Sequence, residues 1–252
     1  MHTTNLRDLY HLHRSKVIVG TLLLLCTAIQ EIKAQGQGYR RKHLEYYDDK
    51  PIHYGILFAV PFTNFNFKHN DYFVSKNAAG AYQDTTYLIQ SPTKAAFRMG
   101  FTINAYLNDR FDIRTTPSVS LYERQVKFSY PDGTEKIEKR ESTWIEVPLL
   151  LKYKSQRRVN SRMYMVAGAT FGIETNVKRS RGTGAGTLST KSSDVTLDYG
   201  VGFEQFFEFF KLAPELRFSH GLTNIFQPSK GSLGSGLNKM TTHTVTLYLN
   251  FE

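Results

Sequence analysis

The side chains that could carry out catalysis are few, and the first candidate is the pair Ser219 and His220. A serine and a histidine oriented by an acid are the nucleophile and general base of many hydrolases. Adjacent residues of a β-strand point to opposite faces, so these two side chains cannot meet if their segment is a strand. His53, next to Tyr54, has no evident acid partner either. We therefore expect no catalytic residue, and we interpret His220 as an interfacial histidine.

Sites for cofactors and metals are also not indicated by the sequence. The run Gly182–Gly186 is similar in composition to a nucleotide-binding loop, but no Lys follows it at the required spacing and no helix is expected after it. No His-Glu-x-x-His motif is present. The single cysteine, Cys26, lies in an N-terminal segment that we expect to be removed, which excludes disulfides and thiolate metal sites. We expect no cofactor and no bound metal.

Basic residues give the chain a formal net charge of +10. Two polar segments are rich in them, one with Lys136, Lys139 and Arg140 and the other with Lys178, Arg179, Arg181 and Lys191. Such clusters suit a partner rich in phosphate, either lipopolysaccharide or nucleic acid, and the targeting segment described next argues against nucleic acid. Two interpretations stay open. The segments are solvated loops that prevent aggregation, or Lys178, Arg179 and Arg181 contact lipopolysaccharide or a partner protein.

Residues 1–34 have the pattern of a secretory signal peptide. Basic residues precede Val17–Ile29, an apolar stretch too short to span a bilayer and long enough for the hydrophobic region of a signal. Ala34 is the small residue expected before the cut. Residues 35–51 would then form a periplasmic lead-in, which is either disordered or a handle for periplasmic partners.

The elements that position the remaining side chains are strands that alternate apolar and polar residues. In Thr244–Phe251 the four odd-numbered residues are apolar, and the even-numbered ones are threonine, tyrosine and asparagine. Eight segments alternate in this way: Ile52–Phe67, Ala95–Leu107, Phe111–Leu121, Ile145–Tyr153, Met163–Ile173, Val195–Phe203, Leu212–Phe218 and Thr244–Phe251. In the first of them the phase slips after Pro61 to Phe65 and Phe67, which predicts a bulge or a strand end.

The connections between these segments alternate in length. Long, polar connections are expected at about residues 68–93, 129–142, 175–193 and 224–241, and short ones at Asn108–Arg110, Lys154–Asn160 and Gln205–Glu208. Short periplasmic turns and long outer loops are typical of outer-membrane barrels. We therefore predict an all-β, eight-stranded antiparallel transmembrane barrel over residues 52–252, with both termini in the periplasm. A soluble β-sandwich or lipocalin-like barrel is the alternative.

Charged residues on the polar face decide between these folds. The expected lumen network consists of Arg98, Asp112, Arg114, Glu146, Asp198, Glu204, Glu215 and Arg217, and Lys152 shares its face. Opposite charges inside a narrow barrel can pair, whereas lone buried charges would be costly. A barrel of eight strands is just wide enough to be filled by its own side chains. We expect a structural plug of ion pairs and no conducting pore.

Several segments resemble the PorT/SprT family of the type IX secretion system of Bacteroidetes. The closest stretch is Glu141–Lys154, ESTWIEVPLLLKYK, and Lys50–Phe67 is similar to the family's first strand. The likeness continues through Phe111–Arg114, Pro117–Ser118, Glu123–Arg124, Tyr199–Phe203, Leu212–Leu216, Gly221–Asn224 and Asn250–Glu252. Together the segments cover nearly all of the chain after the expected signal peptide, in the family's order and spacing.

This resemblance implies a role in protein secretion without chemistry of its own. The family supplies no agreed catalytic residues, so we expect a non-enzymatic component needed for export or assembly of secreted cargo. Its partners would be outer-membrane lipid and lipopolysaccharide, other type IX subunits and the barrel-assembly machinery, with no nucleic acid. The alternatives are a lipid A-modifying enzyme or a small outer-membrane barrel with a structural or adhesive role.

Overall fold

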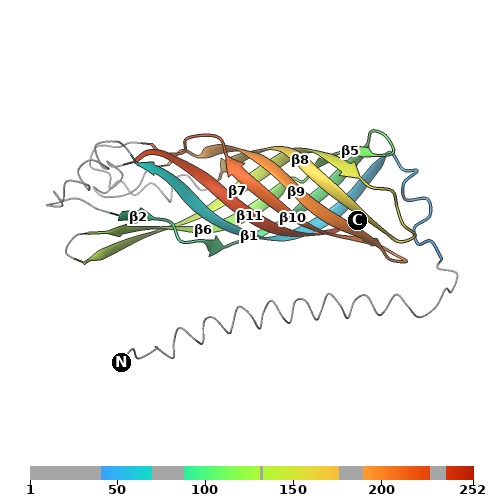
Figure 1. The fold of residues 1–252 in the computed structure, drawn as a ribbon, viewed down its shortest axis with the longest axis horizontal. Coiled ribbons are helices and arrows are strands. Elements are labelled where there is room, and N and C mark those ends of the chain that lie inside the picture. The colour runs from blue at the N-terminus through green and yellow to red at the C-terminus, as the bar shows by residue number, and fades with distance from the viewer. Residues whose placement is uncertain (1–40, 70–87, 131–132, 176–189, 228–236) are drawn as a thin grey trace, which may run out of the picture. The chain divides into compact units, whose positions relative to one another are not determined.

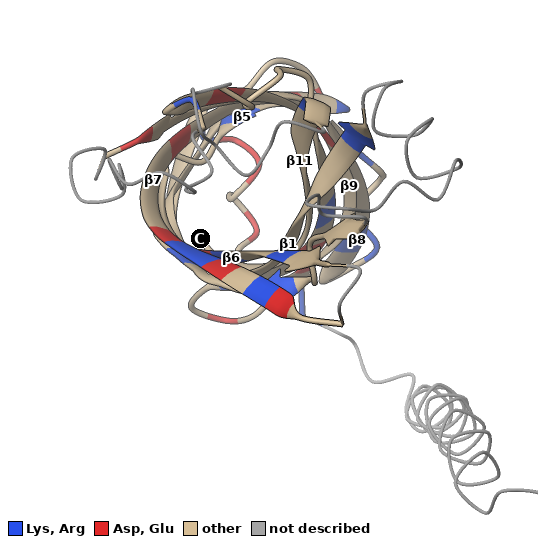
Figure 2. Ribbon diagram, turned by 90° about the vertical axis from the view of Figure 1, so that its left-hand side faces the viewer, with Lys and Arg blue, Asp and Glu red and all other residues tan. Residues whose placement is uncertain are grey.

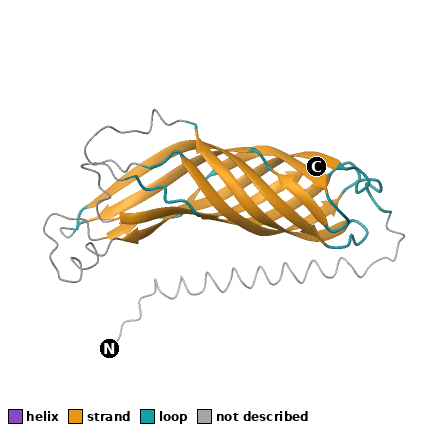
Figure 3. Cartoon of the chain, turned by 90° about the horizontal axis from the view of Figure 1, so that it is seen from above, coloured by secondary structure: helices purple, strands orange, loops and turns teal. Residues whose placement is uncertain are grey.

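The computed structural model describes residues 41–69, 88–130, 133–175, 190–227 and 237–252 (Figure 1). The chain divides into two units, Met1–Arg41 and Lys42–Glu252, and the strands lie in the second. The regular structure of the described residues is β-strand (Figure 3). None of these residues belongs to a helix long and apolar enough to cross a membrane. The expected signal peptide lies outside the described residues.

The strands close into a barrel with eight antiparallel walls. In chain order they are β1 (Ile52–His69), β2 (Leu88–Gln90), β3 (Lys94–Ala95), β4 (Phe97–Tyr106), β5 (Phe111–Thr115), β6 (Ser118–Ser129), β7 (Glu135–Lys154), β8 (Ser161–Glu174), β9 (Ser193–Phe206), β10 (Lys211–Gly221) and β11 (Leu237–Phe251). Strands β3 and β4 form one wall and β5 and β6 another, while β2 pairs only with β6. Pairing of β1 with both β11 and β4 closes the ring (Figure 2). The predicted eight-stranded antiparallel barrel is confirmed.

The two ends of the barrel differ in their connections. One end holds the start of β1, the end of β11 and the short turns at residues 107–110, 155–160 and 207–210, and we call it the terminus end. The longer connections lie at the opposite end, which we call the loop end.

Each strand presents apolar side chains outward and polar ones inward. Large apolar residues cover the outer face, and some are unusually exposed, with 64% for Phe101, 66% for Leu149 and 63% for Met163. Their neighbours in sequence, among them Thr102, are buried toward the lumen. A belt of exposed apolar side chains around a whole barrel is costly in water and favourable in lipid.

The first strand departs from the pattern expected from the sequence. Strand β1 keeps one alternation past Pro61, and its pairing with β11 shifts only between Lys68 and His69. Phe65 is 5% exposed and points into the lumen, where Phe67 packs beside it. The predicted phase slip is wrong because apolar residues also fill the lumen at the loop end, so a phenylalanine there does not have to face lipid.

The connection expected at residues 129–142 is mostly strand. Strands β6 and β7 stay paired from Ser118 opposite Glu146 out to Ser129 opposite Glu135, and a turn containing Gly133 (φ +83°) joins them. The expected loop was wrong because this hairpin carries charges on both faces, which hides the period of two. The basic residues Lys136, Lys139 and Arg140 therefore lie on β7.

Candidate functional site: the lumen of the barrel

Glu204 is the centre of the charges at the terminus end. Its carboxylate is fully buried and contacts Lys152, Arg162 and Lys211, with 3.0 Å from Oε1 to Lys211 Nζ. Glu204 and its three cations come from four neighbouring walls, β7 to β10, and the inward face of each strand brings them to one level. Removing the carboxylate would leave three cations buried without this partner, and such a loss strongly destabilises a fold.

Arg114 links the other carboxylates of this end. Its guanidinium lies 2.7 Å from Glu215 Oε2 and 3.3 Å from Glu252 Oε1, and its Nε donates to Asn104 at 2.6 Å. Arg217 also contacts Glu215, at 2.5 Å. Arg114 is 0% exposed, so its charge is balanced by these partners and not by solvent.

A glycine makes room for an aromatic ring within this layer. Gly202 faces Tyr164 across β8 and β9, and a Cβ at Gly202 would lie 2.2–2.6 Å from three atoms of the tyrosine ring and hydroxyl. Because the glycine has no side chain, Tyr164 lies flat across the lumen and donates its hydroxyl to Glu215 at 2.9 Å. The ring also covers Lys152, whose Nζ lies 4.5 Å from its centroid.

The lead-in covers the lumen at the terminus end. Tyr47 stacks on His53 with ring centroids 4.0 Å apart, and its hydroxyl donates to Glu252 Oε2 at 2.6 Å. Lys211 Nζ in turn donates to the tyrosine oxygen at 2.6 Å. Burial raises the pKa of Tyr47 and the charge of Glu252 raises it further, so the phenol remains a donor. We call this arrangement the Tyr47 latch.

Further contacts hold the lead-in on both sides of Tyr47. Asp48 Oδ1 lies 2.8 Å from Arg162 Nη1, which brings another carboxylate to the lumen charges. Arg157, in the turn after β7, donates to the carbonyl oxygens of His43 and Leu44. These contacts order the described part of the lead-in, and its other expected role, a handle for periplasmic partners, stays a prediction.

A second layer surrounds Arg98 in the middle of the lumen. Its guanidinium contacts Glu146 and the hydroxyls of Tyr122 and Tyr248, and its Nε donates to Ser120 Oγ at 2.8 Å. Tyr122 and Ser120 also donate to the two oxygens of Glu146, at 2.9 and 2.7 Å. All polar atoms of this ion pair are therefore used within the barrel.

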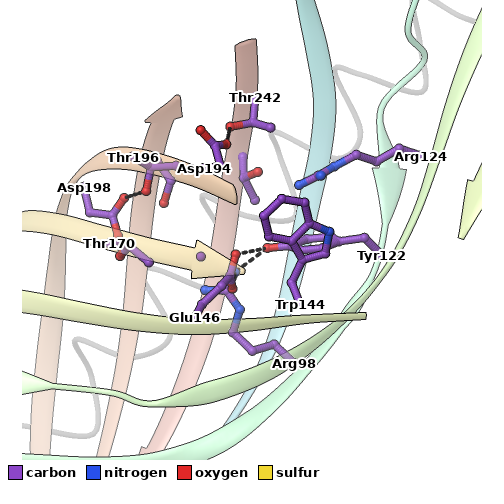
Figure 4. Close-up of a pocket in the computed structure, with 13 residues that line it drawn as sticks. Arg98, Tyr122, Arg124, Trp144, Glu146, Thr170, Asp194, Thr196, Asp198 and Thr242 are labelled. Carbon is purple, nitrogen blue, oxygen red and sulfur yellow. Dashed lines mark hydrogen bonds and ion pairs between the residues drawn. The ribbon is translucent and has the colours of Figure 1, made fainter. Parts of the chain in front are cut away.

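A small polar cavity lies above this layer (Figure 4). Asp198 accepts hydrogen bonds from Thr170 at 2.5 Å and Thr196 at 2.8 Å, while Asp194 accepts one from Thr242 at 2.5 Å. Arg124 faces them with its guanidinium 4.1 Å from the centroid of the Tyr122 ring. The cavity has about 20 Å³ of free space, roughly the room that one water molecule needs.

Apolar side chains fill the lumen at the loop end. Phe128 and Met240 are fully buried there. The complete cluster, which we call the apolar cap, is Phe65, Ile89, Val126, Phe128, Ile225, Phe226, Leu237 and Met240. Strand β2 and the segment after β10 supply Ile89, Ile225 and Phe226, so parts of the connections pack into the mouth of the barrel. The lumen is thus occupied from one end to the other.

Every residue of the network expected from the sequence lies inside the barrel. All are buried except Glu146, which is partly buried, and they are Arg98, Asp112, Arg114, Glu146, Asp198, Glu204, Glu215 and Arg217. Their ion pairs form two groups, with Arg98 and Glu146 in the middle and the rest, apart from Asp198, at the terminus end. The Tyr248 hydroxyl joins the two groups, because it accepts hydrogen bonds from both Arg98 and Arg217. Asp198 takes only threonine hydroxyls among the described residues.

Five members of the terminus-end layer were missed by the pattern of the sequence. They are Tyr47, Lys154, Arg162, Lys211 and Glu252. Lys154, Arg162, Lys211 and Glu252 continue the inward face of their strands by one or two residues, so extending each strand would have found them. Tyr47 lies outside every strand, and no period indicates its position.

The residues considered for catalysis point apart. Ser219 is inside the barrel, whereas His220 is on the outer face with Tyr199 and His243. His53 Nε2 lies 2.6 Å from the carbonyl oxygen of Tyr47. Lys178, Arg179 and Arg181 lie outside the described residues. No three His, Cys, Asp or Glu side chains of the described segments are grouped to hold a metal ion.

Residues 34–227 match the family model described as outer membrane protein beta-barrel domain. The chain belongs to this family. The apolar belt is accordingly the surface that the outer-membrane barrel presents to lipid, and the protein is located in the outer membrane. A search of curated proteins finds no match.

Three solved structures to which the chain is similar match most of its length. OprG from Pseudomonas aeruginosa is 13% identical over 78% of this chain and 94% of its own, with a TM-score of 0.44. Neisserial surface protein A is 6% identical over 80% of this chain and 98% of its own, with a TM-score of 0.42. Ail from Yersinia pestis is 12% identical over 80% and 98%, with a TM-score of 0.33.

Proposed function

We propose that this outer-membrane barrel is a sealed, non-enzymatic component of type IX protein secretion, needed for export or assembly of secreted cargo. The observation that carries the proposal is the filled lumen, from the Tyr47 latch to the apolar cap. A barrel without a free passage does not conduct its cargo, so it acts through its outer surfaces. The resemblance of Glu141–Lys154 and Lys50–Phe67 to the PorT/SprT family supports the choice of secretion system.

The orientation proposed with this function places the terminus end in the periplasm and the loop end outside. Short turns at the terminus end and long connections at the loop end support this direction. Lipopolysaccharide would then surround the loop end, and other type IX subunits would meet the lead-in or the β6–β7 hairpin. The barrel-assembly machinery would insert the chain through its last strand, β11.

A gene deletion tests this function most simply. Cargo should accumulate in the periplasm of the deletion strain, and a plasmid copy of the wild-type protein should restore export. Membrane fractionation and heat-modifiable gel migration establish that the restoring protein is a folded outer-membrane barrel. Normal export with altered lipid A would contradict the proposal and favour a lipid-modifying enzyme.

A variant of the basic residues singled out in the sequence sharpens this test. Replacing Lys178, Arg179 and Arg181 with Ser should reduce secretion if these residues contact lipopolysaccharide or a subunit. The matched control replaces Arg110 and Arg158, two exposed basic residues in turns at the terminus end. Equal secretion in both variants would contradict the contact of these residues with lipopolysaccharide or a subunit. The role of the barrel in secretion would still be tested by the deletion strain.

A further inference from the structure

A row of polar side chains crosses the outer face where the apolar belt ends toward the loops. It consists of Tyr199 on β9, His220 on β10, His243 on β11 and Asn64 on β1. His243 is directly opposite His220 in one strand pair and opposite Asn64 in the other. The residues two positions closer to the middle of the barrel, Phe218 and Val245, are apolar. The two histidines are half-buried, so small solutes reach them from outside.

The two imidazole rings face each other through the same kind of nitrogen. Nδ1 of His220 lies 3.1 Å from Nδ1 of His243, and the ring centroids are 4.7 Å apart. On the far side of the first ring, the Tyr199 hydroxyl lies 3.0 Å from His220 Nε2. The Tyr199 and His220 rings are stacked, with an interplanar angle of 18°. Stacking on Tyr199 therefore fixes the orientation of the His220 ring beside His243.

This geometry suits a shared metal ion as well as a shared proton. When His220 Nε2–H donates to the Tyr199 hydroxyl, its Nδ1 lone pair is directed toward His243. Metal–nitrogen bonds of about 2.0–2.1 Å at a tetrahedral angle separate two ligand nitrogens by about 3.4 Å. The present separation of 3.1 Å is close to that value, so a small rotation of either ring is sufficient. In such sites the ligand histidine usually donates its other ring N–H to a neighbouring acceptor, which fixes the ring.

We propose that His220 and His243 bind a divalent first-row transition-metal ion on the loop-end rim of the barrel. Imidazole nitrogens suit Cu²⁺, Ni²⁺ and Zn²⁺, and the order of affinities makes Cu²⁺ the tightest of these. Within the described segments no carboxylate contacts either ring, so Mg²⁺ and Ca²⁺, which require oxygen ligands, are poor occupants. Water completes the coordination of an ion held by two histidines.

The test is Cu²⁺ binding to the full-length barrel, purified without a histidine tag and folded in detergent. Electron paramagnetic resonance should show one Cu²⁺ with two coupled nitrogens. His220→Gln and His243→Gln should each weaken Cu²⁺ binding by about 100-fold. Loss of a residue that only supports a ligand weakens metal binding by about 10- to 100-fold, and the loss of a ligand should reach the upper end of that range. Tyr199→Phe, which removes only the supporting hydroxyl, should weaken it by about tenfold.

Controls separate this site from general effects on the fold. His43→Gln, at the terminus end, should leave Cu²⁺ binding unchanged, and heat-modifiable migration should be the same for all variants. Zn²⁺ should displace Cu²⁺ from the wild-type protein, and Mg²⁺ should not. A spectrum with one coupled nitrogen, or binding that survives both histidine variants, would overturn the proposal and leave the pair as a hydrogen bond.

Discussion

The terminus end and the loop end of the lumen are filled with different kinds of side chains. At the terminus end, buried cations surround Glu204, Glu215 and Glu252, and Tyr47 covers them. At the loop end, the apolar cap fills the lumen with hydrophobic side chains. Both fillings occupy the lumen, yet one depends on complementary charge and the other on shape and volume.

The comparison shows that either charged or hydrophobic side chains can fill the lumen of one barrel. A charge taken from the terminus end leaves its partner buried and unpaired, which costs more than the pair itself contributes. A side chain taken from the apolar cap leaves a cavity whose cost grows with its volume. The two ends should therefore respond differently to the same class of mutation.

The largest effect is expected at Arg114. Replacing it with Met leaves Glu215 and Glu252 with fewer cations in a buried site, which should reduce the free energy of unfolding by about 3–5 kcal/mol. Urea unfolding of the barrel in lipid vesicles measures this change. The matched control is Arg110→Met, since Arg110 is exposed in a turn and should change stability by no more than about 0.5 kcal/mol. Similar stabilities of the two variants would contradict the account of the terminus end.

The apolar cap should be nearly as sensitive, for a different reason. Met240 is fully buried, and Met240→Ala should lower the free energy of unfolding by about 2–5 kcal/mol because it leaves a cavity. Met240→Leu nearly conserves the volume and should cost less than about 1.5 kcal/mol. Equal losses in both variants would mean that the cap does not depend on packing.

The Tyr47 latch should contribute less than either filling. Tyr47→Phe removes hydrogen bonds with Glu252 and Lys211, and bonds to charged groups contribute about 1.5–3 kcal/mol. Tyr46 is 74% exposed, so Tyr46→Phe provides a control one residue away. Hydrogen exchange of residues 42–50 should rise in the first variant only. Unchanged exchange would show that the latch does not hold the lead-in.

Acid should release the latch at a pH set by Glu252. Burial alone would raise its pKa, but Lys211 and Arg114 lower it from 4.5 to about 2. The stability contributed by this carboxylate is therefore fully present above pH 4.5 and is lost as the pH falls through about 2. Glu252→Gln should flatten the dependence of unfolding on pH in this window. If the pH dependence of unfolding were the same in Glu252→Gln and the wild type, other carboxylates would be responsible for it.

The smallest effect is expected where the same ion-pair geometry is exposed. Lys127 and Glu135 on the β6–β7 hairpin lie 2.7 Å apart, which is the distance between Lys211 and Glu252 in the lumen. Because Glu135 is about half exposed, Glu135→Gln should change the free energy of unfolding by no more than about 1 kcal/mol. A loss as large as that of Arg114→Met would show that burial does not distinguish the two sites.

The two ends also differ in how well the sequence predicts them. Charges that interrupt an apolar period, such as Arg114 and Glu215, indicate an inward face, and the structure places them there. Phenylalanines do not distinguish lipid from an apolar lumen, which explains why the orientation of Phe65 was predicted wrongly. The period of two therefore predicts the walls of the barrel and the charged filling better than the apolar one.

Contacts between distant segments lie beyond any local pattern. Tyr47 and Glu252 are separated by 205 positions, and only the closure of the ring brings the lead-in to the end of β11. His220 and His243 meet because of the register of β10 against β11, and these strands are joined by a long connection that does not reveal the register. Alternation indicates which face each histidine occupies, but not which residue lies opposite.

Ion conductance of the folded wild-type protein in planar lipid bilayers tests the central claim most directly. We predict that the inserted barrel gives no stable conductance steps, because charged layers and the apolar cap fill its lumen. Insertion is monitored independently by flotation of vesicles with the heat-modifiable band. Reproducible open-channel steps from folded wild-type protein would contradict the sealed lumen and the proposal that the barrel works through its surfaces.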